Sequence, residues 1–230
     1  ENHQSFSYNL DLVGGASKNS ATPAELKAAF LETRQLRYPS SNWPHVYTDG
    51  SADGAVRNGG AGVFSTIFEL SEPVGACATN FDGEIAAVLM ALREVQTRRL
   101  QQTVIFVDSQ AAMLALGSAA TPAPSRAIHE SLEVLAQIRE YGGVVHLQWT
   151  PSHCGVKGNE EADRLAKAGA LKAQPDPPQS LHTAKRQIAA AIACRTKERL
   201  VAASAGKDWE SLMAEDGQIS QTLPRRMSVA

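Results

Sequence analysis

The sequence has few cysteines and no long apolar run among its 230 residues. Its three cysteines, Cys77, Cys154 and Cys194, are too few and too widely spaced for a disulfide framework or a CxxC metal site. No stretch reaches the ~18 consecutive apolar residues of a membrane-spanning helix, and the first residues lack the basic and then apolar pattern of a signal peptide. We therefore expect a soluble intracellular protein, in the nucleus or cytoplasm, that is not secreted and has no membrane partner.

Basic residues are scarce in the middle of the chain. Residues 45–170 contain 9 Lys and Arg against 14 Asp and Glu, whereas residues 171–230 contain 9 against 6. Proteins that bind nucleic acids normally gather Lys and Arg on one surface, so the middle segment fits that class poorly by charge alone. Its acidic excess is better suited to a site that binds metal cations.

Turn-forming and proline-rich stretches divide the chain. Residues 22–25, Thr-Pro-Ala-Glu, have the cap, first-turn proline and capping-box acid of a helix start. A turn-rich stretch at 38–44 follows this helix, and residues 173–179 contain three prolines, which is typical of a linker. We expect four parts: an N-terminal extension with one helix (1–44), a compact domain (45–170), a Pro-rich linker (171–180) and a helical C-terminal extension (181–230).

Within the compact domain, the apolar pattern predicts an alternation of strands and helices. Strands are expected at 45–49, 62–68 and 73–78, with a glycine-rich turn between the first two, and short turns make these three an antiparallel meander. Further strands are expected at 103–107 and 144–149, and helices at 83–99, 109–117, 126–141 and 159–170, the last capped by Asn159. This order predicts an α/β fold with a mixed sheet, in which helical crossovers join the meander to parallel strands.

Four acidic residues break the hydrophobic pattern of this fold. Asp49 and Asp108 each follow a strand, and Asp108 lies at the carboxyl edge where parallel sheets place their ligands. Glu84 tops the apolar stripe of its helix, and Asp163 lies beside the packing face of the last helix. Taken singly, each is explained by a turn, a helix end or a solvated surface. Together in one crevice they would repel unless they share protons or bind cations, and carboxylate ligands favour Mg²⁺ or Mn²⁺ over Zn²⁺.

One histidine has a distinctive context. His153 lies in a glycine-bearing loop directly before the helix that carries Asp163. A single histidine is more often a surface or packing residue than a catalytic one, and both alternatives stay open on spacing alone. The other five histidines have no such context: His3, His45, His129, His146 and His182.

Four motifs occur in the order and rough spacing of the ribonuclease H type 1 domain. They are TDGSA (48–52), TNFDGE (79–84), VDSQ (107–110) and WTPSHCGVKGNEEADRLAKAG (149–169). Residues 45–170 therefore resemble this family, whose five-stranded mixed sheet with helices on both sides agrees with the predicted order. The last motif is most similar to the copies carried by non-LTR retrotransposon polyproteins.

This resemblance implies a two-metal nuclease. Asp49, Glu84, Asp108 and Asp163 would hold two Mg²⁺ ions, with Mn²⁺ as a substitute and Asp49 bridging both. Two such ions clamp the attacking water and the leaving oxygen of a phosphodiester displacement. His153 would assist proton transfer or product departure, so its loss should lower the rate without abolishing it. The implied activity is endonucleolytic cleavage of the RNA strand of RNA:DNA hybrids, with 5′-phosphate products, during retrotransposon reverse transcription.

The resemblance also implies contacts with the hybrid. Gly50, Ser51, Asn80 and Gln110 match family positions that approach the nucleic-acid backbone, although for Asn80 and Gln110 a purely structural role is equally open. Some relatives carry a basic protrusion where residues 117–127 have only Arg126. Because several Lys or Arg contacts usually supply most of the affinity for a duplex, we expect weak binding by this domain alone. A reverse transcriptase domain in the same parent polyprotein, or the tail beyond residue 180, could help.

Three other hypotheses remain open from the sequence. Basic residues of the tail do not share one helical face, which favours a packed or linking helix over a nucleic-acid clamp. The compact domain could be a catalytically idle spacer or interaction module of the same fold, although its full set of acids speaks against this. A nuclease or recombinase acting on DNA is less compatible with the loop around His153.

Overall fold

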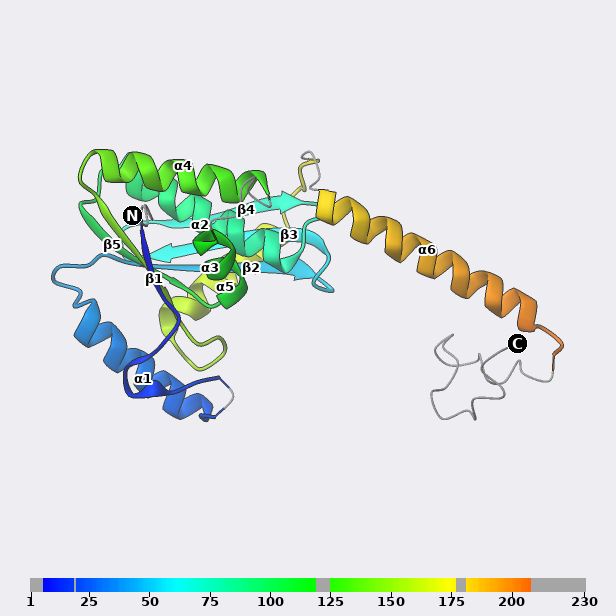
Figure 1. Cartoon of the computed structure of the whole chain (residues 1–230), viewed down its shortest axis with the longest axis horizontal. Helices are drawn as coiled ribbons and strands as arrows, with labels where there is room; N and C mark the ends of the chain where they lie inside the picture. Colours follow the sequence, from blue (N-terminus) through cyan, green and yellow to red (C-terminus); the bar gives the residue numbers. More distant parts are fainter. Residues whose placement is uncertain (1–5, 19, 119–124, 177–180, 208–230) are drawn as a thin grey trace. The chain divides into compact units, whose positions relative to one another are not determined.

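The computed structural model describes residues 6–18, 20–118, 125–176 and 181–207, and the chain divides into two compact units, Glu1–Pro178 and Gln179–Ala230 (Figure 1). His3 and the stretches 119–124, 177–180 and 208–230 lie outside the described residues. Among the helices that the structure describes, none has the length and apolar character needed to cross a membrane.

The first unit is built on one mixed sheet of six strands in the order β1-β6-β5-β2-β3-β4. The strands are β1 (Ser7–Asn9), β2 (His45–Asp53), β3 (Arg57–Ser65), β4 (Glu69–Gly75), β5 (Gln102–Val107) and β6 (Val144–Trp149). Neighbours from β1 to β2 run parallel, and β2, β3 and β4 form the antiparallel meander. The predicted fold class is confirmed. The sixth strand is β1, from a segment in which the sequence predicted only a helix.

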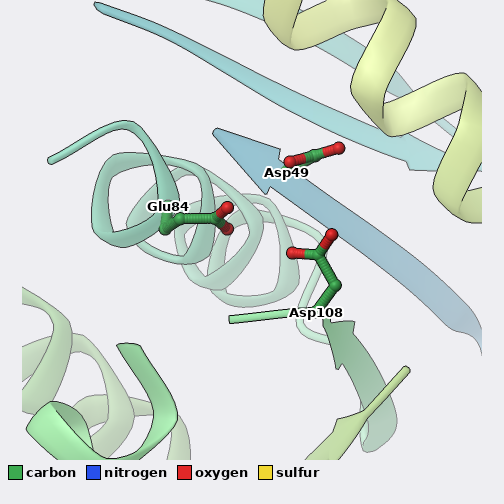
Figure 2. Close-up of side chains that lie close together, drawn as sticks. All are labelled: Asp49, Glu84 and Asp108. Carbon is green, nitrogen blue, oxygen red and sulfur yellow. The ribbon is translucent and has the colours of Figure 1, made fainter. Parts of the chain in front are cut away.

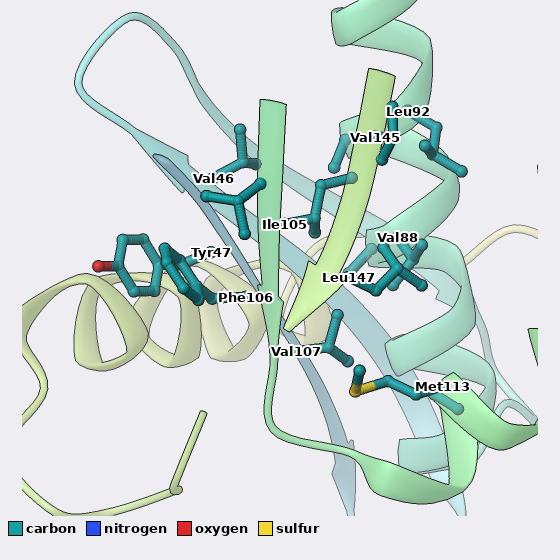
Figure 3. Packing of buried hydrophobic residues seen from close by; sticks show 14 of the residues in the cluster. Val46, Tyr47, Val88, Leu92, Ile105, Phe106, Val107, Met113, Val145 and Leu147 are labelled. Atoms are coloured by element: carbon teal, nitrogen blue, oxygen red, sulfur yellow. The ribbon is translucent and has the colours of Figure 1, made fainter. Parts of the chain in front are cut away.

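Helices cover both faces of this sheet (Figure 1). They are a short 3-10 helix η1 (Val13–Gly15), then α1 (Pro23–Arg37), α2 (Asn80–Thr97), α3 (Gln110–Gly117), α4 (Arg126–Glu140) and α5 (Lys157–Ala170). Residues along a strand alternate between faces, so Phe106 and Val107 point to opposite sides. Phe106 packs on Tyr47 and on Phe30 of α1, whereas Val107 lies towards Val88 of α2 (Figure 3). The core is therefore continuous through both layers.

Glycines set how closely the helices approach the meander. A Cβ on Gly62 would lie 2.1 Å from the backbone oxygen of Ala162, and one on Gly60 would lie 2.1 Å from that of Ala166. The α5 backbone thus rests directly on β3. The sequence predicted a glycine-rich turn before a strand at 62–68, and this is wrong because Gly60 and Gly62 lie inside β3. Glycine is needed at these strand positions because a side chain there would displace α5. The bounds of the neighbouring strands also differ from the prediction. β2 extends to Asp53 where the sequence predicted an end at 49, and β4 covers 69–75 where it predicted 73–78.

The helix starts follow local hydrogen bonding. At α1 the predicted capping box is present, because the Thr22 side chain accepts from the Glu25 amide and the Glu25 carboxylate accepts from Thr22. At α5 the predicted cap is wrong. The helix begins at Lys157 after Val156, which leaves Asn159 inside the first turn with only 4% of its surface exposed.

The second unit contributes one described helix, α6 (Leu181–Ser204). Within this unit the apolar side chains of Ile188 and Ile192 are exposed. The side chains of His182 and Arg186 lie outside the described part, so the expectation that the basic residues of α6 do not share one face stays a prediction. All three cysteines are free thiols, as their spacing predicts.

Candidate metal centre

Two of the candidate carboxylates are brought together by strand register. β2 and β5 run parallel and pair Thr48 with Val107 as the last partners of their ladder. Asp49 and Asp108 directly follow these two partners along the sequence. They therefore lie side by side where the pairing of β2 with β5 ends, at the carboxyl edge of β5.

Glu84 reaches the same point from α2. A Cβ on Gly50 would lie 2.3 Å from the Glu84 backbone nitrogen, so this glycine lets the second turn of α2 sit against β2. One carboxylate oxygen each from Asp49, Glu84 and Asp108 lies within 4.8 Å of the others (Figure 2). The three acids, which are separated by up to 59 positions in the sequence, thus share one small space.

Burial raises the pKa of all three acids, and the charges of neighbouring carboxylates raise it further for Asp49 and Glu84. Desolvation, followed by the charges of Asp108 and Asp163, raises the pKa of Asp49 to about 8. Desolvation and then the charges of its two neighbours raise the pKa of Glu84 well above its ordinary value. Burial also raises the pKa of Asp108, opposed by the Asn159 amide and then by His153. Without a cation, Asp49 therefore favours its protonated form at neutral pH.

The residues fit a hard divalent cation. Glu84 Oε2 is buried and accepts no hydrogen bond in the part of the chain that the structure describes. An oxygen in that position loses its hydration on folding and gains no hydrogen bond in return. A bound cation would supply the missing interaction. A cluster made only of carboxylates selects Mg²⁺ or Mn²⁺ over softer metals. The geometry therefore indicates a metal site, whose ion is not identified.

Asp163 lies at the rim of this cluster and not inside it. Its side chain is 25% exposed on α5, and Lys167, one turn further on, donates a hydrogen bond of 2.6 Å to its Oδ2. Asp163 is nevertheless close enough to raise the pKa of Asp49. The glycine contacts between β3 and α5 place it there.

His153 lies on the Asp108 side of the site. Its backbone is left-handed, with φ of 53°, in the loop between β6 and α5. The start of this loop is held by Trp149 at the end of β6, whose indole Nε1 donates a hydrogen bond of 3.2 Å to the Asp108 carbonyl. The imidazole is exposed, yet its charge lowers the pKa of Asp108. An exposed base beside a metal cluster can exchange protons with water and with a bound ligand.

The four predicted hybrid contacts surround the carboxylates. Gly50 and Ser51 follow Asp49 in β2, and Asn80 is the exposed first residue of α2, whose backbone oxygen faces Gly50. Gln110 is the exposed first residue of α3, two positions after Asp108. Their roles in binding stay predictions.

Two polar residues with a part in the site were missed in the sequence. Asn159 is buried and its Nδ2 lies 3.5 Å from Asp108 Oδ2, and Lys167 holds Asp163. Asn159 was assigned as a helix cap, and an i,i+4 Asp–Lys pair is so common on helix surfaces that Lys167 gave no signal. Only the fold places both beside the acids.

Residues 42–171 of the chain match the model of the family described as RNase H. The match covers more than half of the chain, and all the candidate site residues lie within it.

Proposed function

The chain belongs to the RNase H family and is a ribonuclease that hydrolyses the RNA strand of RNA:DNA hybrids; we propose that it does so endonucleolytically with two Mg²⁺ ions, leaving 5′-phosphate and 3′-hydroxyl ends. The observation that carries the two-metal proposal is the convergence of Asp49, Glu84 and Asp108, with a buried Glu84 oxygen that has no hydrogen-bond partner among the described residues. Mn²⁺ has the same ligand preference and should substitute.

In this proposal each acid has a distinct task. The charges of both Asp108 and Asp163 act on Asp49, so Asp49 would help to hold both ions, with Asp163 contributing to the second. The bound ions would supply charge to stabilise the attacking and leaving oxygens of an in-line displacement. Asn159 keeps the Asp108 carboxylate oriented, and Lys167 fixes Asp163 at the rim. His153 would carry a proton between the reacting oxygens and water.

The hybrid would be held by its backbone. Gly50 and Ser51 border the acids on the β2 side, and Asn80 and Gln110 stand at the starts of two helices. Side chains and amides in these places suit contacts with phosphates and 2′-hydroxyls, which distinguish RNA from DNA without reading base edges. We propose that all four contact the hybrid.

We also propose a wider setting. The motif at 149–169 resembles copies from non-LTR retrotransposon polyproteins, and on this resemblance the domain would act during reverse transcription, inside the cell, beside a reverse transcriptase domain of the same parent chain. The catalytic domain would comprise residues 45–170, with 1–44 and 181–230 as extensions and 171–180 as a linker.

The test is cleavage of labelled substrates by the full chain. A hybrid, an RNA duplex and a DNA duplex are each incubated with Mg²⁺ or with EDTA, and the ends of the products are mapped. Cleavage confined to the RNA of the hybrid, dependent on Mg²⁺ and abolished by Glu84→Gln, is expected. No cleavage at micromolar protein would favour a catalytically idle module, and cleavage of the DNA duplex would contradict the substrate.

A further inference from the structure

The segment before the matched domain runs into the catalytic edge of the sheet. β1 is parallel to β6, and Asn9 at its end pairs with Gln148. Because parallel strands end at the same edge, the chain that leaves β1 emerges where Asp108 and the His153 loop lie. Residues 10–18 therefore pass beside the metal centre, although they precede the family match at 42–171.

This segment is firmly anchored. The fully buried Gln148 donates from Nε2 to the backbone oxygens of Asn9 and Asp11, over 3.3 and 3.0 Å. Arg37 of α1 donates to the Asp11 carboxylate over 2.7 Å and to Gln148 Oε1 over 3.2 Å. Leu12 is 2% exposed in the core. Such a network, with its buried polar groups paired, defines the position of residues 9–12.

A cavity of about 320 Å³ lies between this segment and the sheet edge. Its wall from the segment includes Asp11, Ser17 and Lys18, and its wall from the domain includes Gln110 and Trp149. Gln110 is one of the residues proposed to contact the hybrid. The cavity therefore continues the proposed substrate surface onto residues outside the matched domain.

The charge that the segment adds to this place is positive. Among the described residues that line the cavity, Lys18 is the basic one, and it shares the lining with Gln110 and Trp149. Trp149 donates to the Asp108 carbonyl and Gln110 follows two positions after Asp108, so the cavity that Lys18 lines adjoins the metal centre. The carboxylate of Asp11 is already paired with Arg37, which leaves the ammonium of Lys18 as the cation available to a ligand in the cavity.

We propose that this cavity binds a backbone phosphate of the hybrid next to the bond that is cleaved, with Lys18 as its cationic contact and Gln110 as a hydrogen-bond donor. The proposal rests on the proposed function, because the ligand is the substrate. It also gives the duplex a cationic contact that residues 117–127, with Arg126 as their one charge, supply poorly. A phosphate approaching three carboxylates needs such a counter-charge nearby.

The experiment compares Lys18→Ala, Lys18→Glu and Lys18→Arg in the full chain. Arg139→Ala is the matched control, since it removes one positive charge from the end of α4, at the sheet edge where β6 begins and away from the site. Affinity for a short labelled hybrid is measured in EDTA over a series of KCl concentrations, and KM and kcat are measured with Mg²⁺. Thermal melting checks the fold of each variant.

Loss of one phosphate contact should weaken binding roughly tenfold at low salt and reduce the salt slope by about 1. We expect this for Lys18→Ala, a larger loss for Lys18→Glu, and near-normal affinity for Lys18→Arg, with KM raised more than kcat is lowered. Affinity and salt slope equal to those of Arg139→Ala would overturn the proposal. Because binding and cleavage are separate measurements, hybrid binding that depends on Lys18 without any cleavage would contradict the proposed function and leave the phosphate site supported.

Discussion

At the scale of single residues, the metal centre is a place where stability is given up for chemistry. Two buried carboxyl groups and a partly buried one, with one oxygen each within 4.8 Å of the others, are unfavourable without a cation, as the raised pKa of each shows. Replacing one acid by its amide should therefore affect stability and activity in opposite directions.

Glu84→Gln should raise the melting temperature in EDTA while removing hydrolysis. The neutral amide removes the free-energy cost of keeping this buried carboxyl group protonated in the folded chain, and it can donate to Asp49 or Asp108. Together these effects are worth about 1–2 kcal/mol or a few degrees for a protein of this size. The control is Glu94→Gln in the same helix, which removes a surface ion pair with Arg98 and should change little. Calorimetry and a hybrid cleavage assay measure both effects; an unchanged or lower melting temperature would contradict the crowded anionic site.

Stability of the metal-free protein should fall as the pH rises. Asp49 has a usual pKa of 3.8 and a folded pKa of about 8, so the folded chain retains a proton that the unfolded chain releases. The stabilisation is complete below about pH 4 and is lost as the pH rises through about 8. Denaturant unfolding in EDTA between these values measures it. Saturating Mg²⁺ should flatten the dependence, and an equally steep curve with Mg²⁺ would count against binding by these acids.

His153→Ala should slow hydrolysis without abolishing it. The imidazole is exposed beside Asp108, where it can move a proton but holds none of the three converging oxygens, so a loss in kcat of roughly a hundredfold is expected. Single-turnover rates with Mg²⁺ give the number, and the exposed His129→Ala on α4 is the control. Complete loss of hydrolysis would contradict an assisting role and indicate that the reaction requires His153.

At the scale of elements, the packing of β3 against α5 decides whether Asp163 can approach the other acids. The chain order and fold class were predictable, because the apolar periods of strands and helices differ and the family motifs fall at their ends. The bounds of β3 were not predictable, because glycine is a strand breaker by propensity and its presence in β3 depends on a helix more than 90 positions later. Asn159 was mistaken for a cap for the same reason: only the fold buries it.

Gly62→Ala should displace α5 and reduce activity. The added Cβ would meet backbone atoms of Ala162 and Ala166 at 2.1 and 2.3 Å, and relief requires movement of the helix that carries Asp163. A destabilisation of about 1–3 kcal/mol with a large fall in kcat is expected. Gly142→Ala is the comparison: its φ of 83° makes it unfavourable, but it lies in a turn away from the site, so its cleavage kinetics should be normal. Equal kinetics for both variants would contradict a positional role of α5.

At the scale of the whole molecule, the chain is a family domain with a segment on either side. The earlier segment is part of the first unit. It adds β1 to the sheet and contributes Lys18 to the lining of the cavity. The later segment forms a unit of its own, with a described helix on which Ile188 and Ile192 are exposed.

Removal of residues 179–230 should leave a folded and active enzyme. The first unit contains the sheet, its covering helices and all candidate site residues, so its cooperative unfolding and kcat should match those of the full chain. Melting curves and hybrid kinetics of the shortened chain test this. A raised KM with normal kcat would instead indicate that α6 contributes to nucleic-acid binding.

The parallel pairing of β1 with β6 also bears on where a catalytic fragment can be excised. A fragment starting at residue 42, where the family match begins, would lack β1 and α1. The hydrogen-bonding groups along β6 would then face solvent as a free edge, open to pairing with the same edge of another molecule. Such a fragment should self-associate even with its carboxylates intact, whereas one that starts at or before Phe6 should remain dispersed.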